Sequence, residues 1–287
     1  MLEIVQNNIK SGIISVPYIK NLDDIPPPAR HLMQMDFYLN TKDRIQESYL
    51  YFVPLHSRTA AMIAGRGCPY NCIFCHNTWR GIPFRFHSPE RVVSEIRDIK
   101  NKYNISHLFF IDDNLFVNKH WLREICRLLI HNQINIVWGC NARVDNIDSD
   151  ILRIVKEAGC RQLTFGFESG SQRILDILRK GTTVEQNRLA IKMCKEAGIL
   201  ATGTFMIGNP TETEEDVRLT QQFIKENDID NYGVCLTTPY PGTELWRWCE
   251  KRGFIPSKIE WQDFTFKEIP IRVCEAIPPQ KIIRIVL

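Results

Sequence analysis

Short, nearly continuous apolar runs recur along the chain from about residue 59 onward. Valine, isoleucine, leucine, phenylalanine and small residues fill each run, as is typical of strands buried on both faces of a sheet. We predict six strands, at residues 59–64, 107–111, 134–139, 162–167, 202–207 and 232–237. Strands of this kind need other elements to cover the sheet that they form.

Amphipathic segments with helix-start and helix-stop signals lie between these runs. Ser88 and Pro89 supply an N-cap and a first-turn proline ahead of apolar residues at helical spacing. Another helix ends near Gly198, where glycine suits a left-handed C-cap. Thr213 and Asp216 resemble a capping box, with aspartate in place of the usual glutamate or glutamine. A helix therefore follows most of the predicted strands.

Regular alternation of strands and helices predicts a parallel sheet with right-handed crossovers. A complete eight-stranded barrel typically needs about 250 residues and eight units. Only six units can be counted, so we expect an α/β fold of the partial, open (β/α)6 barrel type, over residues 59–252. Residues 1–58 are rich in proline and polar residues and predict an extended lead-in segment. Residues 253–287 show no further unit and predict a truncated C-terminal extension.

Composition narrows the partners of this fold. The 287-residue chain is 44% hydrophobic and 24% charged, with a net charge of +3, too small to indicate a nucleic-acid partner. No apolar run approaches the roughly 20 residues that span a bilayer, and the first residues lack the apolar stretch of a secretory signal. We therefore expect no membrane partner and a cytoplasmic location.

Three of the ten cysteines crowd into one loop, AGRGCPYNCIFCHN at residues 64–77. Cys68, Cys72 and Cys75 have the spacing C-x3-C-x2-C directly after the first predicted strand. Thiolates are the usual ligands of iron–sulfur clusters, and three thiolates leave one iron of a [4Fe–4S] cluster without a protein ligand. Phe74 places an aromatic ring beside the last thiol. The loop therefore predicts a cluster with an open iron that a substrate can chelate.

Other interpretations of this loop are weaker. A zinc site needs a fourth ligand, and His76 follows Cys75 directly, where two side chains rarely reach one tetrahedral ion. The odd number of cysteines in the loop disfavours a disulfide. The other seven cysteines stand alone in mostly apolar segments, where we expect small buried hydrophobes. They are Cys126, Cys140, Cys160, Cys194, Cys235, Cys249 and Cys274.

The CPYNCIFC segment resembles the signature of the radical S-adenosylmethionine (SAM) superfamily, C-x3-C-x-aromatic-C, and the resemblance extends over roughly residues 59–250. It implies that SAM binds the open iron through its amino and carboxylate groups. It also implies that the reduced cluster cleaves SAM to methionine and a 5′-deoxyadenosyl radical, which abstracts hydrogen.

The same resemblance implies further contacts to SAM at the ends of strands. Asp113 follows the second strand, where the superfamily places a motif that contacts the amino group, although the usual form is glycine-rich with a glutamate. Arg143 offers a guanidinium for a carboxylate, with a surface salt bridge as the alternative. Glu168 can accept from ribose hydroxyls or the amino group, and Gly208 lets backbone approach the adenine unless it only forms a turn.

The lead-in and the segments FFIDDNLF, GFESGSQRIL and TPYPGTEL resemble the cobalamin-dependent branch of the superfamily. This implies methylation or another radical modification of a small-molecule substrate, with an electron donor such as flavodoxin or ferredoxin. No cobalamin domain fits ahead of residue 20, and no D-x-H-x-x-G motif occurs. We therefore expect a fragment, an enzyme without cobalamin, or cobalamin carried by a partner chain.

Two alternative functions stay open. A methylthiotransferase that modifies RNA or protein has a similar barrel, but it normally adds a second cluster and an RNA-binding domain, which are not visible. An iron–sulfur sensor would keep the cluster without catalysis. The segments that resemble adenine and ribose contacts argue against the sensor.

Overall fold

A sheet of six parallel strands organises the computed structural model, which describes residues 18–39, 51, 53–54, 57–75, 83–260, 273–278 and 281–282. Each strand pairs with the next in chain order, and every pair is parallel. The strands are β1 (Thr59–Met62), β4 (His107–Phe110), β5 (Val137–Ala142), β6 (Cys160–Glu168), β7 (Leu200–Ile207) and β8 (Asn231–Leu236). Among the described residues β1 and β8 do not pair, so the barrel is open. The predicted partial (β/α)6 barrel is confirmed.

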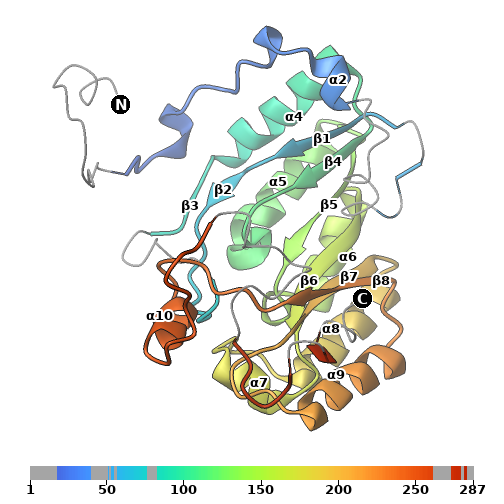
Figure 1. Cartoon of the computed structure of the whole chain (residues 1–287). Coiled ribbons are helices and arrows are strands. Elements are labelled where there is room, and N and C mark those ends of the chain that lie inside the picture. Colours follow the sequence, from blue (N-terminus) through green and yellow to red (C-terminus); the bar gives the residue numbers. More distant parts are fainter. Residues whose placement is uncertain are drawn as a thin grey trace, which may run out of the picture.

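One face of the sheet is covered by the longer helices, which follow one another from strand to strand (Figure 1). They are α4 (Pro89–Tyr103), α5 (Lys119–His131), α6 (Ser149–Glu157), α8 (Val184–Glu196) and α9 (Glu214–Glu226). Shorter elements lie in the connections: the 3-10 turns η3 (Leu115–Val117) and η4 (Val144–Asn146), and the helices α7 (Gln172–Ile177) and α10 (Glu244–Glu250). Within the part of the chain that the structure describes, no helix has the length and apolar character that crossing a membrane requires.

Local capping signals begin and end helices where the sequence predicts. The Ser88 hydroxyl accepts a backbone N–H in the first turn of α4, and Pro89 is its first residue. Thr213 and Asp216 form both hydrogen bonds of the capping box at the start of α9. Gly198 follows α8 with a φ of +66°, the left-handed conformation that glycine adopts at no steric cost. These boundaries follow from neighbouring residues alone.

The third strand lies later in the chain than the sequence predicts. The pattern indicates residues 134–139, whereas β5 spans Val137–Ala142. Ile134 is buried, but its N–H donates to the Leu129 carbonyl oxygen (2.9 Å) and so completes the end of α5. At the other end Ala142 still pairs with Phe165 of β6. The prediction was wrong because buried residues in a turn that ends a helix resemble a strand in their hydrophobicity.

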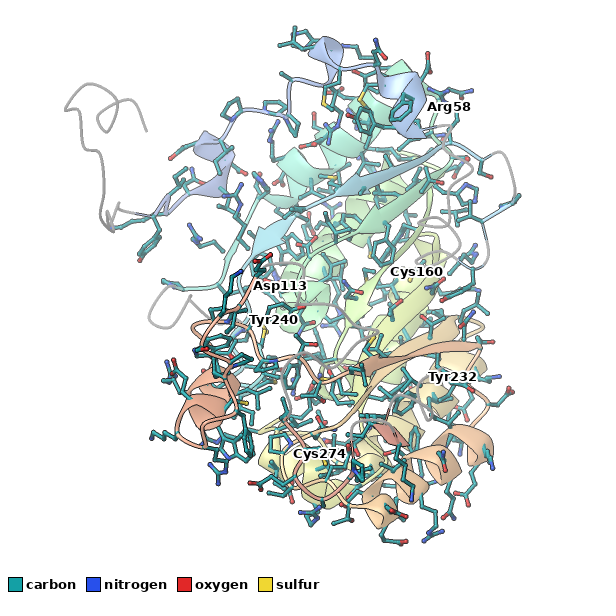
Figure 2. All side chains as sticks on the ribbon, in the orientation of Figure 1. Arg58, Asp113, Cys160, Tyr232, Tyr240 and Cys274 are labelled. Atoms are coloured by element: carbon teal, nitrogen blue, oxygen red, sulfur yellow. The ribbon has the colours of Figure 1, made fainter. Side chains whose placement is uncertain are left out.

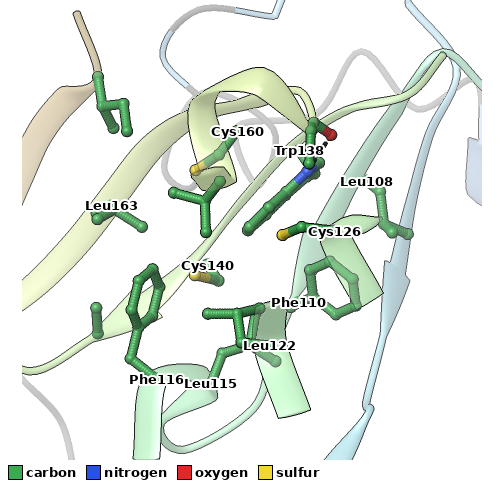
Figure 3. Close-up of a cluster of buried hydrophobic side chains, with 14 of the residues drawn as sticks. Leu108, Phe110, Leu115, Phe116, Leu122, Cys126, Trp138, Cys140, Cys160 and Leu163 are labelled. Atoms are coloured by element: carbon green, nitrogen blue, oxygen red, sulfur yellow. Dashed lines mark hydrogen bonds between the residues drawn. The ribbon is translucent and has the colours of Figure 1, made fainter. Parts of the chain in front are cut away.

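The main core lies between the sheet and its helices, and isolated cysteines help to fill it. Figure 3 shows Cys126, Cys140 and Cys160 around Trp138, whose indole N–H donates to the Ala158 carbonyl oxygen at 2.9 Å. Burial raises the pKa of Cys126 to about 12, so this thiol is protonated and inert. Six of the seven isolated cysteines are buried as predicted, and only Cys235 is half-buried.

Residues ahead of the barrel pack along α4 rather than running free of it. The described part contains the 3-10 turns η1 (Leu22–Asp24) and η2 (Arg30–Leu32) and the short helix α2 (Met35–Leu39). The Asp23 carboxylate accepts the Ser88 N–H (3.0 Å), and Arg30 forms an ion pair with Glu95 (2.7 Å). The lead-in is therefore partly helical where the sequence predicts an extended segment.

Candidate active site

The cysteine loop leaves the sheet at the end of β1 and is fixed there by β4. The carboxylate of Asp112, just after β4, accepts the backbone N–H groups of Ala64 (3.0 Å) and Gly65 (2.5 Å). Burial raises the pKa of Asp112 to about 6, although these two N–H donors oppose the shift. A short hairpin of β2 (Gly65–Arg66) and β3 (Arg85–Phe86), not predicted from the sequence, continues from this point. The loop therefore begins at a defined position on the carboxyl-terminal edge of the sheet.

The far side of the loop is held by two short helices that the sequence analysis did not predict. Ile73 lies between two cysteines; its N–H donates to the Leu178 carbonyl oxygen after α7 (3.0 Å), and its carbonyl accepts the Leu245 N–H in α10 (2.9 Å). The same three side chains form a buried cluster that includes Cys249 and Val273. The loop thus reaches across from β1 to elements that follow β6 and β8.

The three thiols share one electrostatic environment. Cys72 is buried, Cys68 is half-buried and Cys75 is the most accessible. The pKa of Cys75 is raised to about 11, mainly because burial displaces water; the charges of Cys72, Cys68 and Asp113 act in the same direction, and Lys180 opposes the shift. The charges of Asp113 and Lys180 therefore act on the thiols of this loop.

Three thiolates on one loop are the type of donor that binds an iron–sulfur cluster. Within the described residues, no three His, Cys, Asp or Glu side chains are arranged to hold one metal ion, as a structural zinc site requires. Thiolates that hold a cluster bind separate irons, so they surround a volume instead of converging on a point. His76, the alternative zinc ligand, lies outside the described residues. That Cys68, Cys72 and Cys75 hold a cluster stays a prediction from their residue type and spacing.

Arg143 lies against the cysteine loop. Its guanidinium stacks on the Tyr70 ring at 3.5 Å from the centroid, and its Nη1 lies 3.9 Å from Cys72 Sγ. Nε and Nη2 donate to the two carboxylate oxygens of Asp145, both at 3.0 Å, and Nη2 also donates to the Lys180 carbonyl oxygen at 2.7 Å. The salt bridge that the sequence left as an alternative is thus present, although Arg143 is buried and not on the surface.

A buried ion pair that the sequence analysis missed lies at the end of β6. Lys180 Nζ lies 2.8 Å from Glu168 Oε1, and the two side chains are only 9% and 8% exposed. Glu168 is the last strand residue and has a φ of +62°, a conformation that costs a non-glycine residue energy. The ammonium also lies 5.9 Å from the centroid of the Phe74 ring. Lys180 therefore links Glu168 to the cysteine loop.

Nothing local marks Lys180 in the sequence. It stands in a short polar run before a capped helix, where a lysine is normally a solvated surface residue. Glu168 stands 12 positions before it with a turn and a short helix between them, and Phe74 is distant in the chain, so only the folded arrangement identifies it.

Gly208 follows β7 as predicted and has a φ of +87°. Its N–H donates to Glu212 Oε2 (2.5 Å), and the same buried carboxylate accepts the N–H of Asn209. A side chain on Gly208 would meet Ile282 at 3.6 Å. The backbone amide of Gly208 is therefore committed within the protein, and its α-carbon faces the C-terminal segment.

The C-terminal segment contacts both loops of the site. Val273 packs in the cluster around Ile73 of the cysteine loop, while Cys274 packs with Ile207 at the end of β7. Adjacent residues thus bury their side chains in two separate clusters. Val273 and Cys274 therefore pack against the end of β7 and against the loop that carries the cysteines.

The predicted site residues fall into two groups. Phe74 belongs to the cysteine loop, Arg143 contacts it, and Glu168 is linked to it through Lys180, whereas Asp113 acts on its thiols through its charge. In Figure 2, Asp113 lies toward the carboxyl-terminal edge of the sheet, and Arg58, which precedes β1, lies at the opposite edge. Gly208 belongs to the Glu212 network and lies beside Ile282 of the C-terminal segment.

Comparison with known families agrees with this geometry. Residues 62–224 match the model of the radical SAM superfamily, more than half of the chain, so the chain belongs to this superfamily.

Individual relatives refine the comparison. The chain is 35% identical over 250 residues to an uncharacterized methyltransferase of Pyrococcus horikoshii, covering 87% of this chain and 51% of the relative. It is 31% identical over 205 residues to the anaerobic magnesium-protoporphyrin IX monomethyl ester cyclase of Rubrivivax gelatinosus, covering 70% of this chain and 36% of the relative.

Among solved structures, the fold is similar to that of the radical SAM methyltransferase TsrM from Kitasatospora setae with cobalamin and a [4Fe–4S] cluster bound. The TM-score is 0.63 at 18% identity, covering 70% of this chain and 40% of that chain. The chain spans about half the length of the first curated relative and less of the other two proteins.

Proposed function

We propose that this chain carries the catalytic barrel of a radical SAM enzyme that methylates or otherwise modifies a small-molecule substrate. Cys68, Cys72 and Cys75 would hold a [4Fe–4S] cluster with one iron left open for SAM. When bound and reduced, the cluster supplies the electron that cleaves SAM to methionine and a 5′-deoxyadenosyl radical. The observation that carries the proposal is the grouping of three thiols on one clamped loop beside a carboxylate and two cations.

Charged residues around the loop match the polar groups of SAM. Asp113, an exposed carboxylate next to the thiols, suits the amino group, and the Lys180 ammonium suits the carboxylate. The Glu168 carboxylate would accept hydrogen bonds from the ribose hydroxyls or the amino group of SAM in place of part of its contact with Lys180. Phe74 supplies an apolar wall, and an adenine ring would approach the backbone of Gly208 from the side away from Ile282.

Relatives guide the choice of substrate class and partners. The named relatives are methyltransferases and a tetrapyrrole cyclase, so we propose a small-molecule substrate and an electron donor such as flavodoxin or ferredoxin. The enzyme would work either without cobalamin or with cobalamin supplied by another segment or a partner chain. Residues 59–252 would form the catalytic unit, with 1–58 as a lead-in and 253–287 as a C-terminal extension. We expect the protein to act in the cytoplasm.

Anaerobic reconstitution tests the proposal directly. The protein is reconstituted with iron and sulfide, its iron and sulfide content is measured, and dithionite and SAM are added. We expect about four irons per chain and release of 5′-deoxyadenosine. Cys72→Ala should lose both, whereas Cys194→Ala, a buried cysteine of the core, should keep both. A protein that binds zinc instead and leaves SAM intact would refute the proposed function.

A further inference from the structure

The guanidinium of Arg143 has little capacity left to bind a substrate carboxylate. Arginine presents five N–H donors, and bidentate binding of a carboxylate needs two of them in parallel. In this structure Asp145 takes the Nε and Nη2 pair, and the Lys180 carbonyl oxygen takes the second Nη2 donor. Nη1 remains, and its partner among the described residues is Cys72 Sγ at 3.9 Å.

The surroundings hold Arg143 in this orientation. The Tyr70 ring, from the cysteine loop itself, lies against the face of the guanidinium at 3.5 Å. The Tyr70 hydroxyl is hydrogen-bonded to Asn146 at 2.7–3.0 Å, so the ring cannot swing away without breaking this contact. Arg143 is 7% exposed. A cation is thus held beside one sulfur of the loop.

A cation or N–H donor at a ligand sulfur stabilises the more negative, reduced state of an iron–sulfur cluster. An anion in the same place has the opposite effect. Arg143 approaches Cys72 with Nη1, while the Asp145 carboxylate lies on the other side of the guanidinium. The cation is therefore nearer to the sulfur than its counter-ion.

We propose that Arg143 is a positioning residue that raises the reduction potential of the cluster by directing Nη1 at the Cys72 sulfur, and that Asp145 both orients this guanidinium and limits the rise. This role rests on the proposed function, because it requires a cluster at the three cysteines. The step concerned is a one-electron reduction of the cluster by an external donor, with no proton transferred.

The test is a potentiometric titration of reconstituted protein without SAM, followed by electron paramagnetic resonance, so that the readout is independent of turnover. Arg143→Met should lower the equilibrium constant for reduction about tenfold, a shift of 59 mV to more negative potential. Asp145→Asn should shift the potential in the positive direction, since it removes the anion. Arg143→Lys keeps the positive charge but lacks the paired N–H donors of the guanidinium, so its reduction potential should lie between those of Arg143→Met and the wild type.

Arg123→Met is the matched control, because Arg123 forms an exposed ion pair with Asp150 and contacts no residue of the cysteine loop in this structure. It should leave the potential unchanged. Equal potentials in the wild type, Arg143→Met and Asp145→Asn would overturn the proposal. Failure of both Arg143 variants to bind a cluster would also overturn it, because Arg143 would then be a structural support. A wild-type protein that binds no cluster would instead refute the proposed function.

Discussion

The buried pair of Glu168 and Lys180 offers the sharpest test of the site. Removing the ammonium with Lys180→Met leaves the Glu168 carboxylate buried without its counter-ion. The two charged atoms are 2.8 Å apart, which corresponds to a gross attraction of about 6 kcal/mol at an effective dielectric constant of about 20. Desolvation of both groups offsets most of that attraction in the intact pair. In Lys180→Met this attraction is lost, but the Glu168 carboxylate is still buried and still lacks its hydration.

We therefore expect Lys180→Met to lower the free energy of unfolding by about 3–5 kcal/mol, the usual cost of breaking a buried pair. The double variant Lys180→Met with Glu168→Gln carries no unpaired charge and should recover about 2 kcal/mol or more of this loss. A side chain at position 166 would come within 2.4 Å of Glu168 Oε1, so Gly166 leaves the room that this carboxylate occupies.

Urea denaturation of the metal-free protein under reducing conditions, followed by circular dichroism, measures these differences. Lys192→Met is the control, since Lys192 forms an exposed pair with Glu196 at 3.9 Å and should change stability by less than about 0.5 kcal/mol. If Lys180→Met costs no more than the control, or if the double variant is no more stable than the single one, the reasoning about this pair is wrong.

Three further outcomes follow from the structure. Asp112 has a folded-state pKa raised to about 6 from 3.8, so its contribution to stability is greatest below pH 4 and declines as pH rises to 6. Between pH 4 and pH 7 this group should lower the free energy of unfolding by roughly 3 kcal/mol in the wild type, and Asp112→Asn should abolish that decrease. Gly203→Ala places a Cβ 2.4 Å from the Phe167 ring and should cost about 1–3 kcal/mol in urea denaturation, while Gly233→Ala, with nothing within 4 Å, should show no clash. Ile277→Ala creates a cavity in the cluster beside β7 and should cost about 2–5 kcal/mol of local stability. Protease cleavage near the C-terminal segment should therefore become more than tenfold faster. An unchanged cleavage rate would contradict the packing of Ile277.

Local patterns in the sequence were sufficient for the barrel and for the cysteine loop. Buried runs, helix caps such as Ser88 and Thr213, and the C-x3-C-x2-C spacing each depend on residues a few positions apart. The shift of β5 to Val137–Ala142 marks the limit of such patterns, because hydrophobicity alone does not distinguish a strand from a buried turn.

Partners far apart in the chain were decided only by the tertiary structure. The approach of Arg143 to Cys72, the clamping of Ile73 between α7 and α10, and the bridging of two clusters by Val273 and Cys274 join segments that have no common local signal. The sequence by itself determined which residues could bind a cluster and along which elements they lie. The packing of those elements decided which charges face the thiols, because the neighbours of a buried group depend on how distant segments meet and not on the residues next to it in the chain.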